Sequence, residues 1–136
     1  MTVVSLRWWW KSEETKNATL LISYGELEGA EKNINMVKHI ILWTLNPELS
    51  EEEKAQVKLG IKEGLEGLKG KVPGLIDVVV NISGRLASSN CDVMLDSTLE
   101  NAEALKAYAI HPAHVAVADT KVRPYTVQRT CLDFEV

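Results

Sequence analysis

Hydrophobic and polar positions repeat regularly from Met36 onward. Residues 37–45 alternate along the chain and are apolar on both sides, which predicts a strand buried on two faces. Ser50, with Glu53 three residues later, forms the capping box of a helix whose apolar positions then recur at helical spacing. Glycine and proline end this helix near residue 70. The regular region therefore begins with a strand followed by a helix.

The rest of the regular region predicts two strands, a second helix and a final strand. Residues 75–82 and 91–97 are predicted to pair as a hairpin with a long loop. A helix over residues 102–123, interrupted at His111-Pro112, and a strand over residues 125–136 follow. The order β-α-β-β-α-β predicts an α+β, ferredoxin-like fold, in which an antiparallel sheet carries helices on one face.

Both faces of this predicted sheet carry apolar residues. Ile40 and Leu42 share one side of the first strand, and on the second strand Val79 faces away from Val78 and Val80. Helices cover only one face, so the other face needs a different partner. A second copy packed face to face would close a dimeric α/β barrel, and twofold dimers are the commonest oligomers. We therefore expect a homodimer formed through the sheet faces.

Residues 1–35 differ in character from the regular region. Three of the four tryptophans are adjacent at Trp8-Trp9-Trp10, and the polar stretch that follows has neither a strand nor a helix period. We expect an irregular N-terminal extension. One interpretation takes Met36 as the true start of translation and the preceding residues as a misassigned start. The other takes the tryptophans as an anchor for a membrane surface or a partner protein.

Composition is that of an ordinary globular protein. Of the 136 residues, 46% are hydrophobic and 25% are charged, so one compact domain is expected without a disulfide or metal staple. Two cysteines are typical of an intracellular chain, and we expect a cytoplasmic protein. No apolar run approaches the roughly 20 residues of a membrane span, and the N-terminus is unlike a signal peptide. A net charge of −4 without a basic cluster argues against nucleic acid as a partner.

The candidate catalytic and binding residues are three histidines and one tyrosine. Pro112 at the first position of a new helical turn places His111 at the cap and His114 in the first turn, where the helix dipole disfavours an imidazolium. His114 is then a neutral base, and Tyr108, one short turn before His111, can donate a hydrogen bond to a developing enolate. His39 lies on the first strand.

A structural interpretation of the same residues stays open. In it His111 only caps the helix, His114 is partly buried, and Tyr108 belongs to the core with its hydroxyl satisfied. The two helix histidines lack the carboxylates or the i,i+4 spacing of a zinc site, so no metal site is predicted. Cys91 and Cys131 are expected on non-adjacent strands, which argues against a disulfide or a shared metal and supports no reactive thiol.

Asp133 is the carboxylate of most interest. It lies on the last predicted strand, on the same side as Cys131. A carboxylate on an interior strand would orient a nearby imidazole and fix its tautomer.

Three segments resemble a known family. They are residues 36–42 (MVKHIIL), 107–115 (AYAIHPAHV) and 132–134 (LDF), of which Tyr-x-x-His-Pro-x-His is the specific part. On these residues the chain from Met36 to Val136 is similar to the stress-responsive dimeric α/β-barrel family, Dabb. The resemblance implies a ferredoxin-like protomer, a homodimer built through the sheets, and a pocket between sheet and helices.

The resemblance also implies roles for single residues. The plant olivetolic acid cyclase, a relative in kind, closes a ring by intramolecular aldol condensation without a cofactor, and no cofactor is expected here. By similarity His114 is the general base, Tyr108 holds the substrate, and Asp133 orients the base. The expected pocket residues are His39, Trp43, His111 and Asp133.

Val93 departs from that cyclase, which has a further pocket histidine at the matching position, and Cys91 stands where an aromatic residue is common. A polyketide substrate is therefore not implied. Two functions remain open. One is a cofactor-free cyclase or lyase that acts beside a carbonyl group, with His114 as base and Tyr108 as donor. The other is a non-catalytic, stress-associated dimer that binds a small apolar ligand or has a structural role.

Overall fold

The computed structural model describes residues 35–136, and the two interpretations of the N-terminal extension lie outside the described residues. The described region follows the predicted β-α-β-β-α-β order, with the second helix divided into shorter helical segments. In chain order the elements are β2 (Val37–Leu45), α2 (Glu51–Glu66), β3 (Leu75–Asn81), β4 (Val93–Leu99), α3 (Ala102–Ile110), α4 (Pro112–Val117), the π-helical turn η1 (Ala118–Val122), the 3-10 turn η2 (Arg123–Tyr125) and β5 (Thr126–Glu135).

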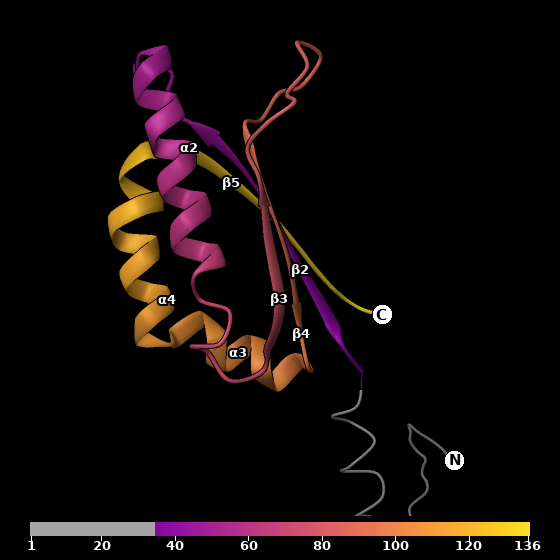
Figure 1. Cartoon of the computed structure of the whole chain (residues 1–136). Helices are drawn as coiled ribbons and strands as arrows, with labels where there is room; N and C mark the ends of the chain where they lie inside the picture. The colour runs from indigo at the N-terminus through magenta and orange to yellow at the C-terminus, as the bar shows by residue number, and fades with distance from the viewer. Residues whose placement is uncertain (1–34) are drawn as a thin grey trace, which may run out of the picture. The chain divides into compact units, whose positions relative to one another are not determined.

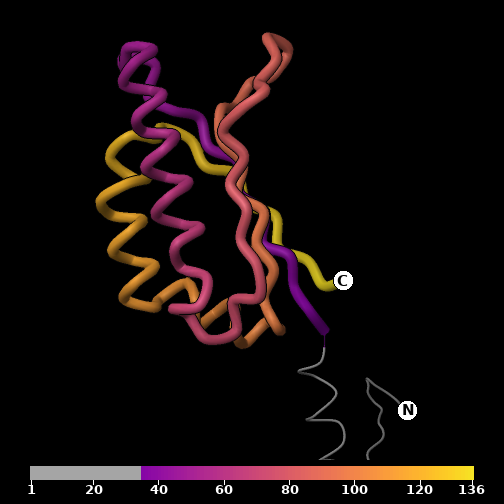
Figure 2. The backbone as a smooth tube through the Cα atoms, viewed as in Figure 1, coloured from indigo at the N-terminus to yellow at the C-terminus, as the bar shows by residue number. Residues whose placement is uncertain are grey.

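The four strands form one antiparallel sheet in the order β3-β4-β2-β5. All the described helices lie on one side of this sheet (Figure 1), which confirms the ferredoxin-like prediction. The β3–β4 hairpin is also as predicted, and the tube in Figure 2 shows its loop extending past the end of the sheet. One expectation was wrong: β5, which carries Asp133, is an edge strand of the protomer and not an interior one.

The core lies between the sheet and the helices. Along β2 the alternate residues beginning at Val37 are buried, and the residues between them are half-buried, as the two-sided alternation predicts. His39 is among the buried residues, with 8% of its surface exposed. It belongs to the same side of β2 as the core residues Ile41 and Trp43. The helix-facing side of the central strand therefore carries one imidazole in an otherwise apolar row.

Helix α2 has the capping box expected from the sequence. The Ser50 side chain accepts a hydrogen bond from the Glu53 N–H, and the Glu53 carboxylate accepts one from the Ser50 N–H. The helix ends at Glu66, a few residues earlier than expected. A side chain on Gly64 would come within 2.8 Å of Val117, so this glycine allows α2 and the second helical region to approach closely.

The second helical region is broken where the sequence predicts a break. His111 has extended backbone angles (φ −64°, ψ 132°) between α3 and α4, and Pro112 starts α4. The chain then passes through η1 and η2 before β5 begins at Thr126, one residue later than expected. In the described part of the chain, no helix combines the length and the apolar character that crossing a bilayer requires.

The cap of α2 gives a test of this local structure. Replacing Ser50 by Ala leaves a backbone N–H of the first turn without its side-chain acceptor, and we expect the free energy of unfolding to fall by about 1 kcal/mol. Urea unfolding followed by circular dichroism measures this difference. Ser88→Ala, in the exposed β3–β4 loop, is the matched control and should change stability by less than about 0.5 kcal/mol. Equal effects of the two substitutions would contradict the capping role.

Candidate functional site

A cavity of about 580 Å³ lies between the helix-facing side of the sheet and the second helical region. Its wall is more apolar than polar and comes from the strands β2, β4 and β5, from the helices α2, α3 and α4, and from η1 and η2. The side chains in its wall that can carry chemistry are His39, Tyr108, His114, Arg123 and Arg129. Trp43 also lines the cavity, as expected. A mostly apolar cavity with a few convergent polar groups is the usual form of a small-molecule site.

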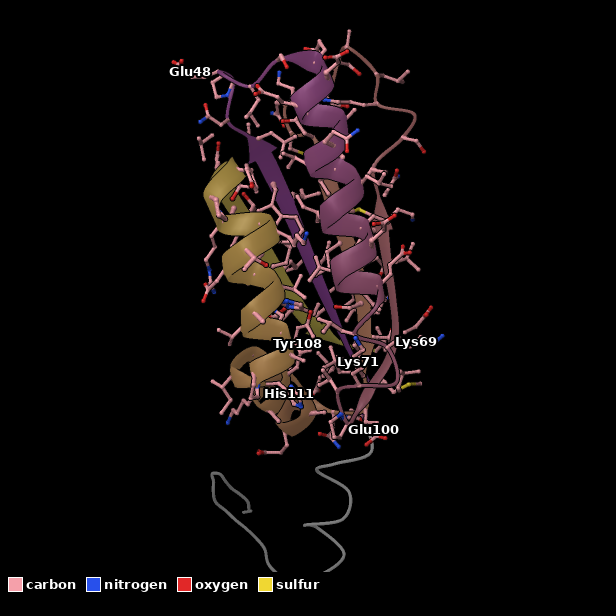
Figure 3. All side chains as sticks on the ribbon, turned by 60° about the vertical axis from the view of Figure 1, so that its left-hand side comes forward. Glu48, Lys69, Lys71, Glu100, Tyr108 and His111 are labelled. Carbon is pink, nitrogen blue, oxygen red and sulfur yellow. The ribbon has the colours of Figure 1, made fainter. Side chains whose placement is uncertain are left out.

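The break in the second helical region brings Tyr108 and His114 together. Tyr108 lies in the last turns of α3 and His114 in the first turn of α4, and their ring centroids are 4.3 Å apart at an interplanar angle of 39°. His39, from β2, meets the Tyr108 ring edge to face at 6.0 Å. Figure 3 labels Tyr108 near the lower end of the helix layer. A phenol and two imidazoles therefore converge, although the second imidazole is His39 and not His111.

Tyr108 is a buried hydrogen-bond donor. Only 1% of its surface is exposed, and its hydroxyl has no hydrogen-bond partner among the described residues. Tyr108 therefore belongs to the core, as the structural interpretation expected, but the described residues do not satisfy its hydroxyl as that interpretation required. Burial raises the pKa of the Tyr108 phenol to about 12, because it disfavours the phenolate. The hydroxyl keeps its proton at neutral pH and can donate a hydrogen bond to a ligand oxygen.

The environment of His114 favours a neutral imidazole of defined tautomer. Nδ1 lies 3.2 Å from the Ala109 carbonyl oxygen, which can only accept, so Nδ1 carries the proton and Nε2 keeps the lone pair. Burial lowers the pKa of His114, and the charges of Arg123, His39 and Arg129 lower it further, against the opposing effect of the Ala109 hydrogen bond. Desolvation is thus the main cause, where the sequence pointed to the helix dipole.

Asp133 orients His39 and not His114. Its carboxylate oxygen lies 2.5 Å from His39 Nδ1 and accepts a hydrogen bond from this nitrogen. The pairing follows from the register of the sheet, because His39 on β2 stands opposite Asp133 on β5. The resemblance implied that Asp133 would orient the base, His114. In the structure Asp133 contacts His39 instead.

His111 does not line the cavity. Its Nδ1 accepts a hydrogen bond from the Ala113 N–H at 3.1 Å and so caps α4, as the structural interpretation expected for this residue. Figure 3 shows His111 labelled where α3 meets α4. Of the expected pocket residues, the structure therefore places His39 and Trp43 in the wall, Asp133 behind His39, and His111 outside.

Two arginines in the cavity wall were missed by the sequence analysis. Arg129 lies on the same face of β5 as Asp133, four residues before it, and Arg123 lies just before β5 begins. Arg123 forms an ion pair with Asp119, whereas no carboxylate of the described residues forms an ion pair with Arg129. The alternation that assigned Asp133 to one face of the strand could also have assigned Arg129 to it.

The lowered pKa of His114 gives a prediction about stability. An unfolded histidine has a pKa of about 6.5, so below that pH the unfolded chain binds a proton that folded His114 resists. The stability contributed by neutral His114 is therefore complete above pH 6.5 and decreases as the pH falls toward its folded pKa. Urea unfolding between pH 8 and pH 5 should show a steeper loss for the native chain than for His114→Gln. Parallel curves for the two proteins would contradict the assignment.

Known structures share this architecture. A dimeric protein of unknown function with a ferredoxin-like fold, from Bacteroides fragilis, is 32% identical with a TM-score of 0.69, over 74% of this chain and 96% of that chain. The hydroxynitrile lyase from Passiflora edulis is 13% identical with a TM-score of 0.59, over 76% of this chain and 94% of the lyase. SnoaB, a cofactor-independent oxygenase from Streptomyces nogalater, is 12% identical with a TM-score of 0.56, over 74% of this chain and 91% of that chain. The last two share the fold alone.

No curated protein matches the chain. The family model of the Stress responsive A/B Barrel Domain, Dabb, matches residues 37–136, which is the whole regular region. The fold, the residues matched and the identity to the Bacteroides fragilis protein agree, and the chain belongs to the Dabb family.

Proposed function

We propose that this Dabb protein is a cofactor-free lyase or cyclase, which removes a proton from a carbon atom beside a carbonyl group. The observation that carries the proposal is the pairing of two neutral groups in one cavity: the unpartnered hydroxyl of Tyr108 and the adjacent imidazole of His114. One can donate a hydrogen bond and the other can accept a proton, which are the two functions that enolate formation requires.

In this mechanism the substrate carbonyl accepts a hydrogen bond from Tyr108, and Nε2 of His114 takes the proton from the neighbouring carbon. The electron pair of the C–H bond moves into the C–C bond, and the carbonyl oxygen becomes an enolate that Tyr108 stabilises. The enolate then either attacks a second carbonyl of the same molecule or expels a leaving group. The imidazolium of His114 returns its proton to the product, so no net proton is consumed.

The positive charges of Arg123 and Arg129 support this chemistry. Both line the cavity, and both lower the pKa of His114. The same charges would stabilise the negative charge that develops on the substrate. Small carbonyl compounds that carry an acidic C–H bond therefore suit the cavity better than purely apolar ligands do. Two fold neighbours bear the names of a hydroxynitrile lyase and a cofactor-independent oxygenase, which is consistent with such chemistry on this fold.

A homodimer formed through the open face of the sheet is the second part of the proposal. This face carries exposed apolar side chains at Val79 (49%), Leu132 (63%) and Phe134 (42%), with Ile40 and Leu42 half-buried between them. The Lys38–Asp96 ion pair lies on the same face. Exposed apolar side chains on an uncovered sheet face, with polar groups beside them, are typical of a protein interface. Packing two such faces together would close a dimeric α/β barrel, and the Bacteroides fragilis relative is described as dimeric. We place this dimer in the cytoplasm.

Proton abstraction can be tested without the natural substrate. The native chain should accelerate the exchange of carbon-bound hydrogen for solvent deuterium in at least one of a panel of small β-keto acids and β-diketones, followed by NMR. His114→Gln should slow this exchange by about 10²-fold or more, because it removes the base. Tyr108→Phe should slow it by about 10²-fold, because it removes the donor to the enolate.

Tyr125→Phe is the matched control for Tyr108→Phe. Tyr125 is 36% exposed and does not line the cavity, so its loss should leave exchange unchanged. If the native chain accelerates exchange in none of the compounds, or if His114→Gln exchanges as fast as the native chain, the alternative of a non-catalytic dimer that binds a small ligand is favoured.

The interface is tested by a charge on the open face. Val79→Lys should turn the dimer into a monomer in sedimentation equilibrium, because the interface would have to bury an additional ammonium group beside Asp96, whose carboxylate already pairs with Lys38. Leu86→Lys is the control, since Leu86 is 70% exposed in the β3–β4 loop and lies off the sheet. A Val79→Lys protein that stays dimeric would contradict assembly through this face.

A further inference from the structure

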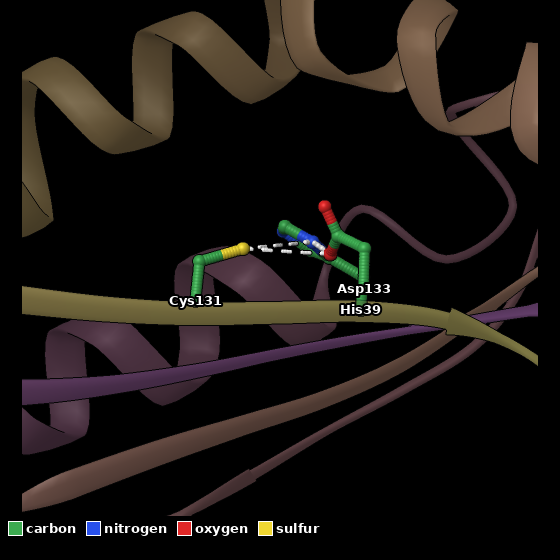
Figure 4. A group of neighbouring side chains, drawn as sticks. All are labelled: His39, Cys131 and Asp133. Carbon is green, nitrogen blue, oxygen red and sulfur yellow. Dashed lines mark hydrogen bonds and ion pairs between the residues drawn. The ribbon is translucent and has the colours of Figure 1, made fainter.

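Three potential metal ligands gather at the edge of the sheet, beside the cavity. Cys131 and Asp133 lie two residues apart on β5, and their side chains project to the same side, next to the His39 ring (Figure 4). Their ligand atoms, Nδ1 of His39, Sγ of Cys131 and a carboxylate oxygen of Asp133, all lie within 4.8 Å of one another. The separations are 2.5 Å between nitrogen and oxygen, 3.4 Å between sulfur and oxygen, and 3.9 Å between sulfur and nitrogen.

This cluster is not arranged as a nucleophilic triad. In a triad the thiol and the carboxylate bind opposite nitrogens of the imidazole, so that the ring can relay a proton. Here both Cys131 and Asp133 approach the same nitrogen, Nδ1. The proposed enolate chemistry uses neither residue, so the cluster needs another explanation.

The separations suit a tetrahedral metal ion. Bonds of about 2.3 Å to sulfur and about 2.0–2.1 Å to nitrogen or oxygen place the ligand atoms about 3.3–3.6 Å apart in a tetrahedron. Both sulfur separations lie within about 0.3 Å of this range. The nitrogen and the oxygen are closer than this because they share a proton. A metal ion in place of the proton would increase their separation by about 1 Å. Asp133 can make this movement, because 41% of its side chain is exposed on an edge strand.

We propose that His39, Cys131 and Asp133 form a binding site for a divalent transition-metal ion of the zinc class. One imidazole, one thiolate and one carboxylate are the ligand types that zinc selects. The thiolate and the carboxylate balance the two positive charges of the ion. Three ligands from the protein leave a fourth position for water or a ligand, and the exposure of Cys131 and Asp133 leaves that position open.

Metal binding would displace protons from the ligands of the site. The Cys131 thiol loses its proton to solvent, and His39 gives up the Nδ1 proton that it shares with Asp133, either to its own Nε2 or to solvent, so at least one proton is released for each ion bound. His39 lines the cavity, and the metal would therefore lie immediately behind the cavity wall. The site shares His39 with the cavity wall but uses neither Tyr108 nor His114 as a ligand, and either proposal can fail without the other.

Cobalt(II) is the probe for this site, because a cobalt–thiolate bond gives an intense charge-transfer absorption in the near ultraviolet. Titration of the reduced full chain with Co²⁺ should produce this absorption, saturating at one ion per chain, and added Zn²⁺ should abolish it. Cys131→Ser should remove the absorption. His39→Gln and Asp133→Asn should each weaken Co²⁺ binding by about tenfold or more.

Cys91→Ser is the matched control. Cys91 is the only other cysteine in the chain and is not part of the cluster, so this variant should keep the full absorption. Circular dichroism of each variant verifies folding, and Cys131→Ala repeats the test if Cys131→Ser does not fold. Absence of a saturable thiolate absorption in the native chain, or its loss in Cys91→Ser alone, would overturn the proposal. These spectra do not depend on turnover.

Discussion

The break between α3 and α4 is the constraint that shapes the candidate site. Pro112 has no backbone N–H and cannot continue α3, so His111 adopts an extended conformation and the chain restarts as α4. The end of one helix and the start of the next then face the same cavity, which is why the rings of Tyr108 and His114 are in contact although they belong to different helices. Close packing at Gly64 holds this second helical region against α2, and so keeps both rings above the sheet.

Burial then acts on the two groups in opposite directions with a common result. It raises the pKa of the Tyr108 phenol and lowers the pKa of the His114 imidazole, because in each case it disfavours the charged form. At neutral pH both groups are uncharged, so the site does not bury an isolated ion. An uncharged donor beside an uncharged acceptor is also the state that proton abstraction requires. The same desolvation therefore serves the fold and the proposed chemistry.

The sequence was most informative where contacts are local. Alternation along β2, the Ser50–Glu53 capping box and the His111-Pro112 break each involve neighbouring residues, and the structure has all three. The contacts of Asp133 could not be predicted in the same way. They depend on the register between β2 and β5, which joins residues 94 positions apart and sets His39 opposite Asp133.

The same register explains what the sequence analysis missed in the site. Arg129 and Cys131 lie on the face of β5 that meets His39 and the cavity, but a strand pattern alone does not say which strand will be its neighbour. For His111, the motif was recognised but the sequence left the direction of the side chain open. Its position in the motif is distinctive, yet the direction of its ring, toward the Ala113 N–H, is decided by the local demand for a helix cap.

The central claim is that His114 presents the lone pair of Nε2 to the cavity at neutral pH. The most direct measurement is the ¹⁵N chemical shifts of the His114 ring in the full chain at pH 7, which distinguish the two neutral tautomers from the imidazolium. We expect a neutral ring protonated at Nδ1, with an Nε2 signal that moves when a β-diketone is added. A ring protonated at Nε2, or an imidazolium at pH 7, would contradict it.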